Sequence, residues 1–130
     1  MEAAQALADL TEISTQIQAA ALFRADGSLE AATVADGSRL VESAQALLAA
    51  ADGVRAEPLV QLEVATAGGS VFVVREGERL VAALTGPEPT VGLVFYDLKS
   101  CLRASAETAE VEKPKRAPKR KPKEEGDGEA

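Results

Sequence analysis

The stretch LVQLEVATAGGSVFVVREGERLVAALTG, residues 59–86, decides the fold. Val60, Leu62 and Val64 alternate with polar residues, which is the two-residue period of a strand with one buried face. Two glycine-containing turns then divide the stretch into three short runs of similar length. Three strands joined by such short turns predict an antiparallel meander.

The last two strands of this meander are apolar on both faces. Residues 71–74 read Val-Phe-Val-Val, and residues 80–84 read Leu-Val-Ala-Ala-Leu. A strand without a polar face has to be covered on both sides. We therefore expect helices above and below the sheet.

The residues before the meander supply two further elements. In EAAQALADLTEIS (2–14), Leu7, Leu10 and Ile13 fall three apart, which predicts a first helix of about three turns. Two strand-compatible runs then flank Asp26-Gly27, a dipeptide that accepts the positive φ angles of tight turns. This pattern predicts a β-hairpin.

A second helix is predicted over 39–52, with Ser38 as its N-cap and Gly53 as its stop. Its predicted core face consists of five apolar residues, Leu40, Ala44, Leu47, Leu48 and Ala51. Beside that face runs a flank of small residues, Ser43, Ala46 and Ala50. Two interpretations of this flank are open: small side chains allow close approach of another helix, or alanine fills an exposed face as a good helix former.

A third helix is predicted after Pro89, with apolar residues at helical spacing up to Leu102. The pattern stops at Ala106, so we place one domain over 1–106 and a tail over 107–130. The tail is predicted to be disordered because it is poor in apolar residues, and three prolines interrupt its lysines. Seven basic residues without an acid form its polybasic block: Lys113, Lys115, Arg116, Lys119, Arg120, Lys121 and Lys123.

Composition excludes several chemistries. The sequence has no His and one cysteine, Cys101, so it offers no imidazole base, no Cys-His dyad and no internal disulfide. Its glycines match neither GxxxxGK[ST] nor GxGxxG. We therefore predict no catalytic residues, no metal ligands, no cofactor and no small-molecule substrate. The absence of a secretory signal and of a long apolar run favours a cytoplasmic location.

The order helix, hairpin, helix, meander, helix resembles the Roadblock/dynein light-chain family in its bacterial, small-GTPase-associated form. The patterns that carry the resemblance are the hairpin AAALFRADGSLEAAT (19–33) and the strand pair VVREGERLVAALTG (73–86). It covers roughly residues 3–104 and implies an α/β (α+β) fold, α-β-β-α-β-β-β-α, with a five-stranded antiparallel sheet between helices. The tail lies outside the resemblance.

The resemblance implies a homodimer, or a heterodimer with a sibling chain, in which third strands pair and middle helices lie side by side. By position, this assigns strand 59–65 and helix 39–52 to the interface. An edge strand with few residues that block pairing tends by itself to associate with a strand of another chain. The predicted interface residues are Ser43, Ala46, Ala50, Val60, Gln61, Leu62, Glu63 and Val64.

Two functional hypotheses follow. The first is a non-enzymatic regulatory or scaffold dimer that docks on a Ras-like small GTPase or a signalling complex. Its partner would contact the middle helix at Arg39, Glu42, Gln45, Ala46 and Ala49. The alternative is a dimerised tether that binds nucleic acid or an anionic membrane through the polybasic block. Three other interpretations of this block are open: a flexible solubilising end, a contact with an acidic protein, and a segment that lies across the acidic domain of its own chain and screens the partner surface. Residues 1–106 carry 14 acidic and 7 basic side chains, which disfavours phosphate binding by the domain itself.

Two residue types outside these sets also need an interpretation. Arg24, Arg75 and Arg79 at strand ends suggest an arginine finger for a GTPase, but solvated arginines are the usual finding at such places. We predict solvated arginines at all three. Cys101 falls on the apolar side of the third helix, so we predict a buried core residue there, not a reactive thiol.

Overall fold

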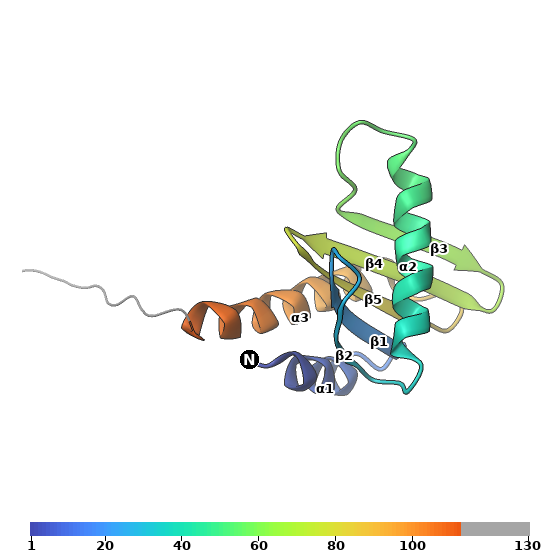
Figure 1. Ribbon diagram of the computed structural model, residues 1–130. Helices are drawn as coiled ribbons and strands as arrows, with labels where there is room; N and C mark the ends of the chain where they lie inside the picture. Colours follow the sequence, from blue (N-terminus) through green and yellow to red (C-terminus); the bar gives the residue numbers. More distant parts are fainter. Residues whose placement is uncertain (113–130) are drawn as a thin grey trace, which may run out of the picture.

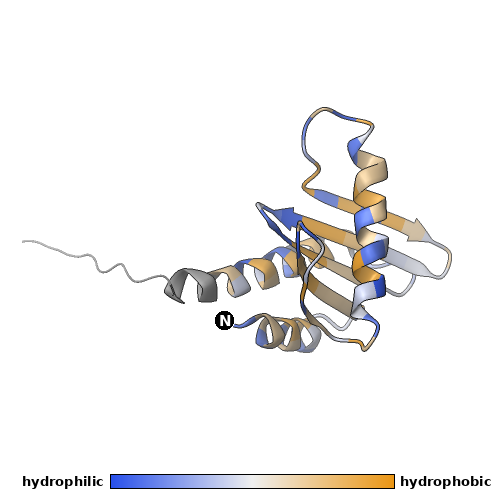
Figure 2. Ribbon diagram, in the orientation of Figure 1, coloured by the Kyte–Doolittle hydropathy of each residue, from blue (hydrophilic) through white to orange (hydrophobic). Residues whose placement is uncertain are grey.

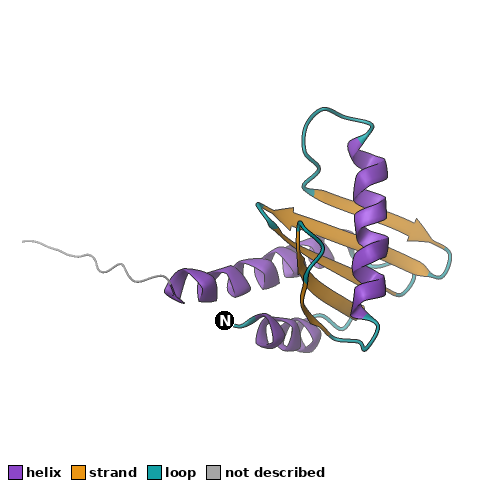
Figure 3. Ribbon diagram, viewed as in Figure 1, coloured by secondary structure: helices purple, strands orange, loops and turns teal. Residues whose placement is uncertain are grey.

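The computed structural model describes the backbone of residues 1–112 and the side chains of residues 1–106. The described residues form three helices and five strands (Figures 1 and 3). In chain order they are α1 (Ala3–Ile13), β1 (Ile17–Arg24), β2 (Leu29–Ala32), α2 (Gly37–Asp52), β3 (Gln61–Thr66), β4 (Gly69–Glu76), β5 (Arg79–Thr85) and α3 (Val91–Glu112).

The five strands form one antiparallel sheet in the order β2-β1-β5-β4-β3. Helix α2 covers one face, and α1 and α3 lie together on the other (Figure 1). Buried apolar side chains form one core cluster on each face, and the central strands are correspondingly hydrophobic in Figure 2. The predicted fold class and the covering of both faces are confirmed.

Two turns fix the register of the sheet. At the β1–β2 turn Gly27 has φ +94°, and Asp26 Oδ1 accepts hydrogen bonds from the Ser28 backbone N–H and hydroxyl. At the start of β4, Gly69 has φ +148°, and a Cβ there would lie 2.1 Å from the Thr85 carbonyl oxygen. The second turn therefore requires glycine for both its backbone angle and its close approach to β5.

Three predicted details of the helices are wrong. Helix α2 begins at Gly37 with Asp36 as its N-cap residue and no side-chain cap, so Ser38 does not cap it. Ile13, predicted on one side of α1 with Leu7 and Leu10, is not buried with them: it is the last residue of the helix and is 72% exposed. Helix α3 continues to Glu112, six residues beyond Ala106, because no proline stands before residue 114.

Candidate protein-docking surface

Helix α2 crosses the sheet with one side buried. Leu40, Val41, Ala44 and Leu48 belong to the core cluster that α2 shares with β1, β4 and β5. The predicted core face contained three of these but lacked Val41, and its Leu47 and Ala51 are only half-buried. The helix is therefore turned about its axis, and it leaves an apolar leucine between the core and solvent.

The small flank predicted on α2 faces solvent. Ser43, Ala46 and Ala50 are all exposed. Their positions are therefore available to another molecule, and α2 can be approached closely along this side because no bulky side chain covers it. Both interpretations of the flank are compatible with this placement.

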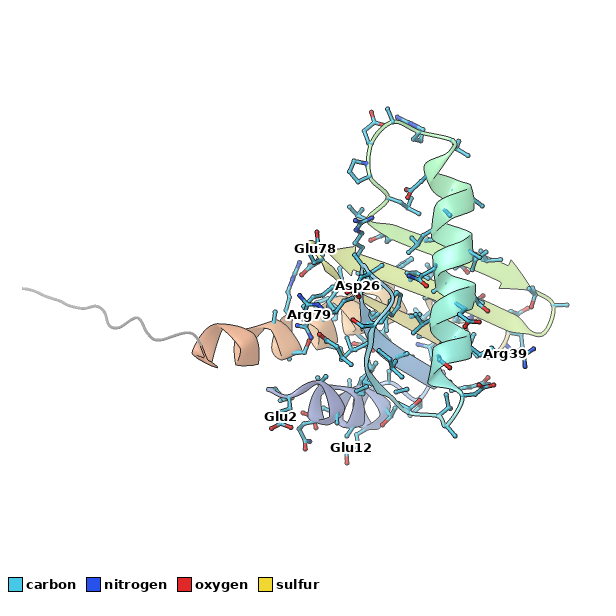
Figure 4. The ribbon with its side chains drawn as sticks, viewed as in Figure 1. Glu2, Glu12, Asp26, Arg39, Glu78 and Arg79 are labelled. Atoms are coloured by element: carbon cyan, nitrogen blue, oxygen red, sulfur yellow. The ribbon has the colours of Figure 1, made fainter. Side chains whose placement is uncertain are left out.

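The predicted partner-binding residues do not all face solvent. Arg39, Glu42 and Ala49 are exposed, and Arg39 extends away from the helix near its start (Figure 4). Gln45 is half-buried and lies so close to the β1–β2 turn that a Cβ on Gly27 would meet its Nε2 at 2.9 Å. Gln45 therefore lies on the flank of α2 that faces this turn, away from Ser43.

Strand β3 forms an open edge of the sheet. It pairs with β4 on one side, and no described strand pairs with its other side. Leu62, which stands opposite Val73, and Val64 point toward the side of α2, whereas Gln61 and Glu63 point to the side of α1 and α3. The predicted interface residues of this strand are thus divided between the two faces, as in any strand. What they share is the unpaired backbone edge.

The residues before β3 extend this edge. Val60 lies outside the strand, although its carbonyl accepts a hydrogen bond from the Arg75 backbone N–H. Its side chain is 62% exposed, which makes it the most exposed apolar residue beside the edge. The strand therefore begins two residues later and ends one residue later than the predicted strand 59–65, and Leu59 and Val60 belong to the preceding loop.

Two hollows lie along the small flank of α2. One, of about 440 Å³, is lined by Leu40 and Ser43 of α2 and by Val71 and Leu84 of the sheet. The other, of about 400 Å³, lies between Ala51 and the loop before β3. We call the area that joins them the α2/β3 surface; it consists of Ser43, Ala46, Leu47, Ala50, Val60, Leu62 and Val64. These seven residues are mostly apolar, and β3 adds an unpaired strand edge, whereas the two hollows are also lined by charged residues, Asp36, Arg39, Arg55 and Glu57.

Val71 and Leu84, which line the larger hollow, and Leu47 of the α2/β3 surface were not predicted to lie here. Val71 and Leu84 belong to strands that are apolar on both faces, so their period gives no indication that they are half-exposed. Leu47 was assigned to the core face. No local signal distinguishes them, because their exposure depends on where α2 lies across the sheet.

The three arginines differ in their surroundings. Arg75 Nε donates to the Gly77 carbonyl, and Arg24 is about half exposed, as predicted. Arg79 is not solvated: its side chain is 16% exposed, and Nη2 lies 2.5 Å from Glu30 Oε1. Arg24 Nη1 donates to the other oxygen of Glu30 at 3.1 Å. This is a structural ion-pair group and it lies away from the α2/β3 surface (Figure 4).

The pKa of Glu30 reflects these contacts. Partial burial by itself raises it, but the hydrogen bonds and charges of Arg79 and Arg24 outweigh burial and hold the pKa below its ordinary value. Cys101 is buried as predicted, and burial raises the pKa of its thiol to about 11. A thiol in this state is a poor nucleophile.

The described residues contain no group of three or more His, Cys, Asp or Glu side chains arranged to hold a metal ion. Within the same part of the chain no helix is long and apolar enough to cross a bilayer. The polybasic block, from Lys113 to Lys123, lies outside the described residues.

Comparison with known proteins identifies the fold. No family model and no curated protein matches the sequence. Among solved structures, a Roadblock/LC7 domain from Streptomyces avermitilis is 16% identical, with a TM-score of 0.73 over 85% of this chain and 99% of that one. The chain has the Roadblock/LC7 fold. The resemblance inferred from the sequence is confirmed at this level.

Two solved structures of MglB are similar as well. The gliding protein MglB from Thermus thermophilus is 16% identical, with a TM-score of 0.71 over 84% of this chain and 89% of that one. An MglB with a tetrameric arrangement is also 16% identical, with a TM-score of 0.72 over 84% of this chain and 88% of that one. Over residues 1–112, the order α-β-β-α-β-β-β-α matches the Roadblock/LC7 fold.

Proposed function

We propose that the protein is a dimeric regulatory or scaffold protein that docks on a Ras-like small GTPase through α2. The α2/β3 surface is the observation that supports dimerisation, because an unpaired strand edge and an exposed flank of small residues adjoin there. Pairing of two β3 edges satisfies backbone groups that an open edge leaves to water. The same operation brings two copies of α2 together, and their alanines permit close packing.

The residues of the surface support a homodimer. In a two-fold interface each residue set meets its own copy, so a self-complementary surface has to avoid facing like charges. Apart from Glu63, which lies on the opposite face of β3 and accepts a hydrogen bond from Ser70 Oγ, the α2/β3 surface and its strand carry no charge. A two-fold arrangement there brings apolar residues against apolar residues.

The GTPase-type partner follows from the Roadblock resemblance, and solvent-facing Arg39, Glu42 and Ala49 supply the contact. We place this role in the cytoplasm. The tether hypothesis rests on residues outside the described part of the chain, whereas the regulatory dimer rests on residues of α2 and β3 that the structure describes. No catalytic step is assigned to this chain.

The interface is tested with a pair of alanine variants. Ala46→Glu places a charge on the small flank, and Ala8→Glu places one on an exposed site of α1. Each changes the stability of a monomer by no more than about 0.5 kcal/mol. Burying an unpaired carboxylate in an interface costs several kcal/mol, so Ala46→Glu raises the dimer dissociation constant by about 100-fold or more. Equal dissociation constants for the two variants contradict the interface.

The partner is tested separately. Purified small GTPases of the host, loaded with GTP or GDP, are titrated against the wild-type protein and against Arg39→Glu and Glu42→Arg. The proposal expects binding that depends on the nucleotide and is weakened by both variants, while Arg103→Glu, at an exposed site of α3 on the opposite face of the sheet, binds as the wild type does. If no GTPase binds while the protein remains a dimer, the proposed GTPase partner is contradicted and the proposed dimer is not affected.

A further inference from the structure

A second groove lies on the opposite side of the molecule from the α2/β3 surface. It runs between α1 and α3 and has a volume of about 350 Å³. The two helices are antiparallel, so that Met1 at the start of α1 lies beside Ala104 of α3, where its amine donates to the carbonyl at 3.1 Å. Leu10 and Cys101 line the groove. We call it the α1/α3 groove.

The walls of this groove expose large apolar side chains. Ile13 is 72% exposed and Tyr96 is 68% exposed, and both line the groove near the end of α1. Leu93, one turn before Tyr96, is also half-exposed. Single exposed apolar residues are ordinary, but here they adjoin a concave site on two helices.

The side chains that line the groove carry negative charge, and the Met1 ammonium is the one positive group there among the described residues. The lining includes the carboxylates of Asp9 and Asp97 and no lysine or arginine. Among residues 1–106 neither carboxylate takes part in an ion pair. Two more carboxylates, Glu2 and Glu12, stand at the ends of α1 (Figure 4). A ligand for this groove should therefore combine positive charge with apolar stems.

We propose that the α1/α3 groove is the docking site of residues 113–123 of the same chain. These eleven residues contain seven Lys or Arg and no acid, whereas residues 1–106 contain twice as many acidic as basic side chains. Lysine and arginine carry long aliphatic stems that cover apolar surface while their charged ends reach carboxylates. They also bind the faces of tyrosine rings. One segment thus supplies both kinds of contact that the groove offers.

The geometry allows this contact within one chain. Helix α3 ends at Glu112, sixteen residues after Tyr96, which is about 24 Å along a helix at 1.5 Å per residue. Eleven residues span at most about 36–40 Å. The basic segment can therefore return along α3 as far as Tyr96. Docked there, it lies on the face opposite α2 and leaves the α2/β3 surface free, so this proposal does not depend on the dimer.

The sequence provides a built-in reporter for the test. Tyr96 is the one tyrosine of the chain and there is no tryptophan, so tyrosine fluorescence reports on this groove alone. In the full-length protein, acrylamide quenching of Tyr96 is compared between the wild type and a variant with all seven basic residues of 113–123 changed to Gln. Asp9→Asn/Asp97→Asn removes the carboxylates, and Glu57→Gln/Glu78→Gln is the matched control on other surfaces.

Docking predicts that quenching of the wild type is about twofold weaker than that of the neutralised-tail variant, since stems cover one of the two faces of the ring. The Asp9→Asn/Asp97→Asn variant should match the neutralised tail, and the control should match the wild type. Salt at about 1 M, where the Debye length is about 3 Å, should abolish the difference. Equal quenching of the wild type and the neutralised-tail variant at low salt overturns the proposal.

Carbodiimide cross-linking supplies a second readout that does not need any variant to fold. Lysines of 113–123 should link mainly to Asp9, which is half-buried, and less to Asp97, which is 9% exposed, as mapped by peptide mass spectrometry. Links confined to carboxylates outside the α1/α3 groove contradict the proposed site. A mixture of isotopically light and heavy chains then distinguishes links within one chain from links between two copies. Links between a light and a heavy chain place the segment in the groove of a neighbouring copy and overturn the same-chain assignment.

Discussion

Replacing Glu30 by glutamine tests how much one ion-pair group contributes to the sheet. Glu30 is the extra residue at the register shift in β2, where Leu22 stands opposite Ala31 and Phe23 opposite Leu29. A bulge redirects a side chain, and here it brings the carboxylate of β2 to Arg24 of β1 and Arg79 of β5. Three neighbouring strands are thereby joined at one end of the sheet.

The magnitude follows from burial. The side chains of Glu30 and Arg79 are 22% and 16% exposed, and Nε and Nη1 of Arg79 are buried without a hydrogen-bond partner among the described atoms. Glu30→Gln keeps the shape but leaves the guanidinium without its anion. Breaking a fully buried pair costs 3–5 kcal/mol, so a partly hydrated pair should cost about 2 kcal/mol. For a domain of this size that corresponds to a fall in Tm of about 8 °C.

Thermal and urea unfolding, followed by circular dichroism at one protein concentration, measure the loss. The matched control is Glu57→Gln, whose partner Arg55 is 74% exposed, and it should change stability by less than about 0.5 kcal/mol. Because the folded-state pKa of Glu30 is depressed, its stabilisation is present above the ordinary value of 4.5 and is lost as pH falls through the folded pKa. The difference between wild type and Glu30→Gln should therefore shrink on acidification. Equal unfolding midpoints for Glu30→Gln and Glu57→Gln at neutral pH refute this reasoning.

Three further predictions concern the turn, the edge strand and the thiol. In a urea titration, Gly69→Ala should destabilise the domain by about 3 kcal/mol or more, because the φ of Gly69 is positive and an added Cβ would meet the Thr85 carbonyl. The control Gly68→Ala has open space around its Cβ and should cost less than about 1 kcal/mol. Leu62→Arg should lower both the Tm and the apparent mass in solution, whereas Val54→Arg, in the exposed loop after α2, should change neither. An unchanged mass for Leu62→Arg argues against an interface at the β3 edge. Cys101 should react with iodoacetamide about 100-fold more slowly in the native protein than in urea, and similar rates would show that it is accessible.

Local pattern was sufficient to predict most of the fold. The two-residue period of β3, the glycine turns and the doubly apolar β4 and β5 each follow from a few neighbouring residues, and the element order follows from them. The exposure of Ser43, Ala46 and Ala50 follows from helical phase. These features depend on short-range geometry, which a sequence records directly.

Features that depend on long-range placement could not be predicted. Arg79 and Glu30 are 49 residues apart, and their contact requires the β2 bulge, which no motif marks. The half-burial of Leu47 depends on how α2 rotates over the sheet. The α1/α3 groove requires two helices from opposite ends of the domain, and the exposure of Ile13 in it results from where α1 ends.

The central claim is that the α2/β3 surface joins two copies of this chain. Light scattering coupled to size-exclusion chromatography at micromolar concentrations tests it most directly. The account predicts a mass of twice 13.5 kDa for the wild type and for Ala8→Glu, and a shift toward 13.5 kDa for Ala46→Glu. A wild-type mass of 13.5 kDa throughout the concentration series contradicts it.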